Sequence, residues 1–497
     1  MRGIYTPVTK IRRQVFTEIA KLAYEQKPLS MIEDLVYKII PGEAPTYRES
    51  IFKERAIIGE RLRLALGLPL RPVNKPSVIS KDIEKADIAE KYYEPPLVNV
   101  IPFACDACAE KSYFVTNNCR GCLGHPCTVV CPVKAVHRSK KNGCAKIDLE
   151  QCIKCGRCKE ACPYSAIVKR ERPCAVACGV NAIGSDYLGR AKIDYEKCVS
   201  CGMCIVNCPF SAIADKSQLY QLIQAINAGN QVIAAIAPAF VGQFGPLATP
   251  DKIKPALQML GISDVYEVAV GADVGAIEEA HHFMKNVPER LPFLATSCCP
   301  SWSSMAKNTF PELVSCISDS LTPMVATARL IKQHHPSAKV VFIGPCSSKK
   351  LEASRTSVRS DVDFVVTFEE LMGMFVAKEV EFSELPSMPL TGAATASGRG
   401  YAIASGVADA IQKCVQAYYH EDIPLDRAEG LAECRKMLSL AKAGKRNGYL
   451  LEGMACPGGC IGGAGTIIPE NKAIKAVESF KQNASRTLPD NQLLDLP

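Results

Sequence analysis

The spacing of the cysteines constrains this chain more than any other feature. Residues 96 to about 215 hold 17 of its 25 cysteines, in short segments rich in Gly, Pro and Lys. A segment of this size builds little apolar core, so metal ligation would have to stabilise it. Two runs have the form C-x2-C-x2-C-x3-C-P and a third lengthens one gap: Cys152, Cys155, Cys158 and Cys162; Cys198, Cys201, Cys204 and Cys208; and Cys119, Cys122, Cys127 and Cys131.

Runs of this form hold 4Fe-4S clusters in bacterial ferredoxins. The first three cysteines bind one cluster and the fourth reaches its neighbour, so such runs are expected in pairs at a short separation. Cys131 and Cys152 are 21 positions apart, which suits a pair. Cys162 and Cys198 are 36 positions apart, so the second pair is interrupted.

The interruption contains part of another run. Cys174 and Cys178 resemble the tail of a run that lacks its head. Cys178 lies 20 positions before Cys198, which restores the pair spacing. The missing head is expected at Cys105 and Cys108, which arrive from the other end of the segment. This arrangement resembles the split runs of four-cluster, ferredoxin-like electron-transfer proteins.

These spacings predict four ligand sets and hence three to four accessory 4Fe-4S clusters. Cys144 is left without a set. Structural zinc is the alternative, chiefly for the group around Cys105 and Cys108, because zinc sites use C-x2-C pairs without the C-x3-C-P tail. The predicted sets are Cys119, Cys122, Cys127 with Cys162; Cys152, Cys155, Cys158 with Cys131; Cys198, Cys201, Cys204 with Cys178; and Cys105, Cys108, Cys174 with Cys208.

Sequence patterns divide the chain into three parts. Residues 1–95 lack cysteine and read as helices, with a start at Thr6 and Pro7 and capping boxes predicted at 30–33 and 46–49. Residues 96–215 form the ferredoxin-like domain. From 216 to 497, apolar runs such as "VIAAIAP" and "KVVFIGP" alternate with helical stretches, which predicts an α/β domain with mostly parallel strands. Cysteines follow these strands, whose carboxyl ends form sites in open sheets.

Hydropathy and charge indicate a cytoplasmic protein without a nucleic-acid partner. No apolar run approaches the length of a membrane span, and the first residues lack the apolar segment of a signal peptide. The formal net charge is +8. Each cubane held by four thiolates carries about two negative charges, so several clusters would cancel most of that surplus.

Three further cysteine loops lie in the C-terminal part: "TSCCPSW" at 296–302, "GPCSSKK" at 344–350 and "EGMACPGGCIGG" at 452–463. Together and in this order, behind a ferredoxin-like segment, they resemble the three active-site signatures of the iron-only hydrogenases. The resemblance covers roughly residues 100–470 and is strongest to the divergent group B branch. It implies the α/β catalytic domain of that family.

The resemblance also implies ligands for an H-cluster, which is a 4Fe-4S cluster joined to a two-iron unit with CO, cyanide and azadithiolate ligands. The implied ligands are Cys299, Cys346, Cys456 and Cys460, of which Cys460 also bridges to the two-iron unit. Cys298 binds no metal and relays protons. A thiol of pKa about 8.5 suits that role better than a serine hydroxyl.

Two more side chains of the cavity follow from the resemblance. Lys349 matches a lysine that donates a hydrogen bond to a cyanide ligand. Met454 matches a methionine packed against the two-iron unit. The second loop departs from the family, because Gly344 stands where a methionine is usual.

The family proton path leads from the relay cysteine to the surface. Glu279 matches its first glutamate and Ser318 its serine. The second glutamate is replaced by His282, which can also shuttle protons near neutral pH. A solvated helix residue is the alternative interpretation of His282.

The implied function is reversible H2 oxidation and proton reduction. Electrons would pass through the accessory clusters to a ferredoxin or similar carrier, and dedicated maturation proteins would supply the H-cluster. The alternatives are an iron–sulfur assembly factor that shares the loops without the two-iron unit, an H2-sensing protein, and a bare multi-cluster electron carrier. Lys349, Met454 and the complete first loop favour the enzyme over the assembly factor.

Overall fold

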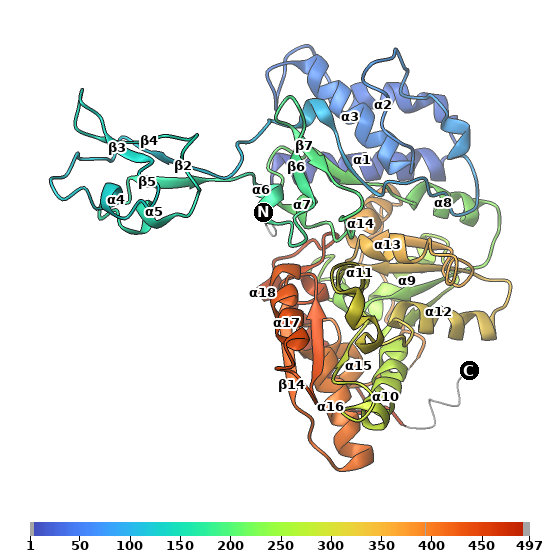
Figure 1. The fold of residues 1–497 in the computed structure, drawn as a ribbon. Coiled ribbons are helices and arrows are strands. Elements are labelled where there is room, and N and C mark those ends of the chain that lie inside the picture. Colours follow the sequence, from blue (N-terminus) through green and yellow to red (C-terminus); the bar gives the residue numbers. More distant parts are fainter. Residues whose placement is uncertain (1–3, 393, 491–497) are drawn as a thin grey trace.

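The computed structural model of the chain describes residues 4–392 and 394–490. It combines an N-terminal helical region, an α/β domain and two small cysteine-rich units, one of which projects from the rest (Figure 1). This architecture confirms the predicted α/β fold behind a ferredoxin-like segment. Among the described residues, no helix combines the length and hydrophobicity needed to cross a bilayer.

The α/β domain contains two parallel sheets. In spatial order, the first has β10 (Asp264–Glu267), β9 (Val232–Ile236), β12 (Lys339–Gly344) and β13 (Phe364–Thr367). The second has β11 (Leu294–Ala295), β15 (Leu450–Met454) and β14 (Leu425–Glu429). Strand β9 is apolar and buried along its whole length, as expected for a central strand between two parallel neighbours.

Helices surround these sheets (Figure 1). They are α8 (Leu219–Asn227), α9 (Ile253–Met259), α10 (Ala269–Asn286), α11 (Pro300–Thr309), α12 (Pro323–His334), α13 (Ser348–Glu352), α14 (Phe368–Ala377), α15 (Ala396–Gly400), α16 (Gly406–Tyr419), α17 (Leu431–Lys442) and α18 (Glu470–Gln482). Helix α12 packs on the first sheet and α16 on β15 of the second. The long helix α10 contacts both α12 and α16 and therefore joins the two halves of the domain.

The N-terminal region contains α1 (Pro7–Tyr24), α2 (Ile32–Ile39) and α3 (Ile51–Ala65). The hydroxyl of Thr6 caps α1, as predicted, by accepting a hydrogen bond from the backbone N–H of Thr9. Helix α1 packs against α14 and α8. The helical region therefore shares one hydrophobic core with the α/β domain.

The two capping boxes predicted after α1 are wrong. Helices α2 and α3 begin at Ile32 and Ile51 without a side-chain cap. Before α3, the backbone N–H groups of Thr46 and Arg48 donate to the carboxylate of Glu54 at 3.0 and 2.6 Å. Glu54 lies inside α3 and is buried, so it needs these donors more than an exposed residue would.

The projecting unit, called the lobe, comprises residues 111–170 (Figure 1). It has two antiparallel strand pairs, β2 (Ser112–Val115) with β5 (Ile167–Arg170) and β3 (Val136–Arg138) with β4 (Ala145–Ile147). It also has two short helices, α4 (Pro126–Val129) and α5 (Arg157–Glu160). Because β2 and β5 are paired, the chain enters and leaves the lobe at one place.

The second cysteine-rich unit, called the base unit, lies against the α/β domain (Figure 1). Its elements are β1 (Val98–Val100) paired with β8 (Ile213–Asp215), β6 (Ile183–Ser185) paired with β7 (Ala191–Ile193), α6 (Pro173–Val176) and α7 (Met203–Asn207). Lys350 of α13 joins it to the α/β domain by bonding to Asp215 and Glu370 at 2.9 and 2.7 Å.

The lobe is inserted into the base unit. Its two ends, residues 111 and 170, lie a few positions from Cys108 and Cys174, which belong to one predicted ligand set. The guanidinium of Arg172 closes this junction by donating to the carbonyls of Cys108 and Gly184. The insertion is the structural reason for the interrupted cysteine run.

Candidate active site

Each predicted active-site loop follows a strand. Cys298 and Cys299 lie between β11 and α11, Cys346 follows β12, and the loop of Cys456 and Cys460 follows β15. Strands β11 and β15 are parallel neighbours, so the first and third loops leave at the same edge of their sheet. Both leave at the carboxyl edge, where sites form in parallel sheets.

The loops surround a cavity with about 550 Å³ of empty space. Five of its lining residues were predicted for one site: Cys298, Cys299, Lys349, Met454 and Cys460. Apart from Tyr401, the rest of the lining is apolar: Ala237, Pro238, Ala239, Val268, Ala269, Ala272, Pro323, Met324, Phe342, Pro345 and Ala402. A concave, mostly apolar space with a few polar groups is typical of a cofactor site.

The two remaining predicted ligands, Cys346 and Cys456, lie on loops whose other residues line this cavity. The Sγ atom of Cys346 is 3.0 Å from the hydroxyl of Ser348. Burial raises the pKa of Cys299 and Cys460, and the nearby thiol of Cys346 adds to both shifts. Cys456 follows β15 in the same glycine-rich turn as Cys460.

Lys349 is a buried cation in the cavity wall. Its Nζ atom lies 2.7 Å from a carboxylate oxygen of Glu352 and 3.4 Å from the carbonyl oxygen of Cys298. Burial alone would lower the pKa of Lys349, but Glu352 outweighs burial and raises it. The side chain therefore stays charged, which suits an anionic ligand in an apolar space.

The residues of the cavity fit an H-cluster. Three thiols, those of Cys298, Cys299 and Cys460, meet at one space beside a fixed ammonium group. The hydroxyl of Tyr401, in the same wall, is buried and has no hydrogen-bond partner among the described residues. Unpaired buried donors are rare in native interiors, so the wall is suited to a bound group with hydrogen-bond acceptors.

Polar groups lead outward from Cys298. Glu279, on α10, is buried, is hydrogen-bonded to the side chain of Ser318 and accepts from the backbone N–H of Ser297. Burial raises the pKa of Glu279 to about 7. The pKa of Cys298 is raised by burial and then by nearby Glu279. A carboxyl that titrates near neutral pH can both take up and release protons there.

His282 is not joined to this path. Within the described residues its imidazole has no hydrogen bond or ion pair, and its backbone carbonyl accepts from Asn286 at 2.9 Å. Glu278 is half-buried on α10, and its pKa is raised by burial and then by Asp319. Asp319, which directly follows Ser318, is exposed.

Glu452 is a buried group of the site that no sequence signal indicated. It lies in β15, and its carboxylate accepts hydrogen bonds from the backbone N–H groups of Ser405 and Ala408 at 2.8 and 2.7 Å. Burial raises the pKa of Glu452 to about 7. Its place two residues before Met454 was the one available hint, and Tyr401 offered none.

The cysteines of the accessory sets come together in the structure. In one set, Cys158 lies near Cys152 and Cys155. In another, Cys204 lies near Cys178, Cys198 and Cys201. Cys131 packs in the core of the lobe. Two small cavities, one in the lobe and one in the base unit, are lined respectively by Cys119, Cys122, Cys127 and Cys162, and by Cys105, Cys108, Cys174 and Cys208.

Backbone N–H groups point at a thiol of every accessory set. Such N–H···S bonds help to set the reduction potential of iron–sulfur clusters. Cys144, left without a set, instead donates from its thiol to the carbonyl of Cys119 at 3.3 Å. The N–H groups of Ala145, Lys154, Ala182, Ala191 and Ala212 lie 3.2–3.4 Å from the Sγ atoms of Cys119, Cys152, Cys178, Cys105 and Cys208, respectively.

The base unit touches the candidate active site. The pKa of Cys201 is raised by burial, and Cys299 adds to the shift from across the interface. Gly202, with a φ of +77°, lets the backbone approach the active-site loops closely, since an added Cβ would lie 2.5 Å from Ala464. The set of Cys198 is therefore the accessory set that adjoins the cavity.

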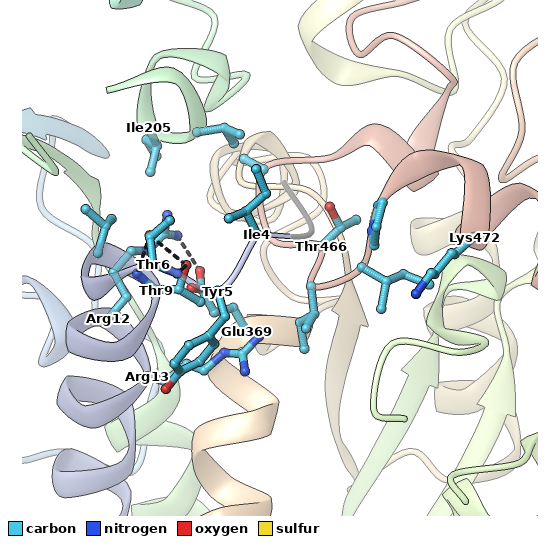
Figure 2. Close-up of a pocket in the computed structure, with 16 residues that line it drawn as sticks. Ile4, Tyr5, Thr6, Thr9, Arg12, Arg13, Ile205, Glu369, Thr466 and Lys472 are labelled. Atoms are coloured by element: carbon cyan, nitrogen blue, oxygen red, sulfur yellow. Dashed lines mark hydrogen bonds and ion pairs between the residues drawn. The ribbon is translucent and has the colours of Figure 1, made fainter. Parts of the chain in front are cut away.

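A further cavity, with about 1000 Å³ of empty space, lies between α1, α7 and the loop after Cys460 (Figure 2). Figure 2 shows Arg12 paired with Glu369, and Thr6 bonded to Thr9, in its wall. None of its lining residues is a cysteine, so it lies outside the candidate active site.

The two cysteine-rich parts of the chain match known families. Residues 230–464 match the iron-only hydrogenase large subunit, C-terminal domain, and residues 145–168 and 191–214 match the 4Fe-4S binding domain. The chain is 28% identical over 393 residues to iron hydrogenase 1 of Clostridium pasteurianum, covering 68% of this chain and 67% of that protein. It is 24% identical over 341 residues to the cytosolic Fe-S cluster assembly factor narfl of Danio rerio, covering 56% and 82%.

A solved structure of the FeFe-hydrogenase HydA1 from Chlamydomonas reinhardtii aligns with a TM-score of 0.44 and 21% identity, covering 54% of this chain and 88% of that one. The chain spans 63–67% of the length of the hydrogenases it matches. The family model over residues 230–464 and the similarity to iron hydrogenase 1 confirm the resemblance seen in the three cysteine loops. The chain therefore carries 4Fe-4S binding segments followed, at residues 230–464, by a domain of the iron-only hydrogenase large-subunit family.

Proposed function

We propose that this chain is a hydrogenase that catalyses reversible H2 oxidation and proton reduction at an H-cluster. One observation supports this most directly. Cys298 lines the cavity shared by Lys349 and Cys460, nearby Glu279 raises its pKa, and Glu279 is hydrogen-bonded to Ser318, so these three groups would carry protons from the cavity.

The cavity residues would hold the cofactor. Cys299, Cys346, Cys456 and Cys460 would bind the 4Fe-4S part, and Cys460 would also bridge to the two-iron unit. When bound, that unit would supply the metal centre at which H2 is split or formed. Met454, 2% exposed, would exclude water through its soft thioether without competing strongly as a ligand.

The side chains of the protein would move the protons. Each H2 oxidised yields two protons and two electrons. The thiol of Cys298 would carry each proton to Glu279, and Ser318 would pass it toward Asp319 at the surface. Because the pKa of Glu279 is about 7, this carboxyl can serve both directions at neutral pH. Electrons would pass through the accessory clusters to a ferredoxin-type carrier.

An assembly factor is the second candidate function, because the narfl factor aligns over 82% of its own length. The cavity weighs against it. Without the two-iron unit, the hydroxyl of Tyr401, which has no partner among the described residues, would face an empty apolar space. Burying a hydroxyl without a partner is costly.

An infrared spectrum of anaerobically matured protein separates these functions. We expect bands of metal-bound CO and cyanide, together with reduction of the accessory clusters by H2. A protein with full 4Fe-4S clusters but no such bands would be an assembly factor rather than a hydrogenase. Bands with very slow turnover would indicate an H2 sensor.

A further inference from the structure

The net positive charge of the chain is concentrated in the lobe. Residues 111–170 contain twelve Lys and Arg but three Asp and Glu, a formal net charge of +9, whereas the whole chain carries +8. All twelve cationic side chains are exposed, and within the described residues only Lys169 forms an ion pair, with Glu171. Two cubanes with about two negative charges each would still leave the lobe near +5.

Exposed apolar side chains lie among these charges. Ile153 and Lys154 directly precede Cys155, which is an exposed member of its ligand set. The surface of the lobe therefore combines cations, apolar contact area and the edge of a cluster site. Its most exposed apolar residues are Leu123 (97%), Val129 (79%), Leu149 (60%), Ile153 (59%) and Tyr164 (50%).

We propose that the lobe is the docking surface for an acidic electron-carrier protein. The proposal rests on the proposed function, whose electrons it would bring in or take away. Unlike charges steer association, and small apolar contacts suit the short-lived complexes of electron-transfer proteins. In each encounter one electron crosses between the cluster of the carrier and that of the Cys155 set, so one is oxidised as the other is reduced and no bond breaks.

A nucleic acid would also respond to positive charge, but the lobe fits a protein better. Single strands bind through exposed aromatic platforms. Of the three Tyr and Phe residues in the lobe, Tyr113 is buried and Phe114 lies under the guanidinium of Arg170, 4.3 Å from its ring centre. Only Tyr164 is left to stack, whereas exposed aliphatic side chains are frequent.

The test measures how fast the accessory clusters accept electrons. The full chain, with its clusters reconstituted, is mixed anaerobically with a reduced acidic bacterial ferredoxin. Lys140→Glu with Lys159→Glu lowers the lobe charge by four units. Lys307→Glu with Lys475→Glu is the matched control on exposed sites outside the lobe. We expect the lobe variant to be reduced roughly tenfold more slowly at low salt, with the difference fading at high salt.

Three outcomes decide the proposal. A reduced viologen, too small to need a docking surface, should reduce both variants and the parent at similar rates. Equal rates with the ferredoxin in the lobe variant and the control would overturn the proposal. So would tight binding of single-stranded RNA that the lobe variant loses while its ferredoxin rate is unchanged. Cluster reduction by ferredoxin is measured without H2. It therefore tests the docking surface even if the chain has no hydrogenase activity.

An independent observation concerns Tyr401. Its hydroxyl lies in the wall of the active-site cavity, buried and without a hydrogen-bond partner in the part of the chain that the structure describes. Burial raises the pKa of Tyr401 well above its ordinary value, and Glu279 and Cys298 add to the shift. The hydroxyl is therefore neutral at physiological pH and remains available as a donor.

We infer that the hydroxyl of Tyr401 donates a hydrogen bond to a ligand of the group bound in this cavity. On the proposed function, that group is the two-iron unit. The other fixed donor of the wall, Lys349, already pairs with Glu352. A buried hydroxyl is costly while it lacks a partner, so loading the cavity would satisfy it.

Tyr401→Phe tests this by removing only the hydroxyl. Tyr418→Phe is the matched control, since the hydroxyl of Tyr418 donates to the carbonyl of Pro489 at 2.7 Å, away from the cavity. Without cofactor, Tyr401→Phe should melt at a higher temperature than the parent and Tyr418→Phe at a lower one. With the two-iron unit loaded, Tyr401→Phe should shift at least one CO or cyanide infrared band, and the control should shift none.

Two results would overturn the role of Tyr401. Infrared bands identical to those of the parent would show that the hydroxyl does not contact the unit. A lower melting temperature of the empty Tyr401→Phe protein would show that the hydroxyl already has a partner. If the parent takes up no two-iron unit, the proposed function fails, and the melting comparison still reports whether the hydroxyl is unpaired.

Discussion

Cys298 and Cys299 are adjacent in the chain but face different groups, because one lies beside Glu279 and the other beside Cys346. Cys298→Ser removes no proposed ligand, so iron content and infrared bands should be kept. Turnover should fall roughly a hundredfold to ten-thousandfold, because a serine hydroxyl is too weak an acid to exchange protons at neutral pH. Assays of H2 uptake alongside iron analysis of the same samples check this.

The neighbouring positions provide the controls for that experiment. Cys298→Asp should recover part of the rate with a shifted pH optimum, because it restores a titratable group of similar reach. Cys299→Ser should lose cluster iron instead. Loss of iron in Cys298→Ser would show that Cys298 is a ligand and would contradict the relay.

Glu279 should make stability depend on pH. Its pKa is raised from 4.5 to about 7 by burial, so the folded state holds the proton more tightly than the unfolded state does. This contribution is complete below about pH 4.5 and is lost as the pH rises through about 7. Glu279→Gln removes the loss, which amounts to roughly 3 kcal/mol. The melting temperature of Glu279→Gln, relative to that of the parent, should therefore rise between about pH 5 and pH 8.

Other groups that face Glu279 shape this pH dependence. The carboxylates of Glu278 and Glu452 raise its pKa further, whereas Ser318 and the N–H of Ser297 lower it. Glu421→Gln, on an exposed position, should leave the pH profile of the parent unchanged. If the Glu279→Gln and parent profiles ran parallel, the buried carboxyl would not titrate in this range.

At the scale of single elements, the start of α1 can be tested against the start of α2. The hydroxyl of Thr6 accepts from the N–H of Thr9, whereas Ser30 makes no cap for α2. Thr6→Ala should therefore destabilise α1 by about 1 kcal/mol, and Ser30→Ala should change little. Hydrogen exchange of the amides in each helix measures both. Equal effects would mean that the Thr6 cap contributes nothing particular.

Local signals predicted those features whose partners are close in sequence. The cap at Thr6 and the cysteine loops after strands are of this kind. Glu54 was missed because its capping partners depend on how α3 packs. Tyr401 reaches the cavity, and Glu452 reaches the start of α16, through tertiary contacts that no short motif encodes. His282 aligned with a path residue, but its imidazole makes no bond to that path.

For the molecule as a whole, the iron content reports the number of clusters. Protein made without the machinery for the two-iron unit should contain about 20 irons per chain, as five cubanes of four. Cys105→Ala should lower this to about 16, because it opens the split set. Cys144→Ala, at the cysteine without a set, should leave the parent value. A parent value near 12 that Cys105→Ala did not change would remove the split set from the list of cluster sites.

The insertion of the lobe has a consequence for how such a chain can evolve. The paired strands β2 and β5 connect the lobe to the rest of the chain at a single point. On the base-unit side of this point, Arg172 donates to the carbonyl of Cys108. A unit attached at a single point can be gained, exchanged or lost in one genetic event, without disturbing the fold of the base unit and the α/β domain. The lobe and the candidate active site can therefore evolve at different rates, so that the same catalytic domain can be coupled to new redox partners.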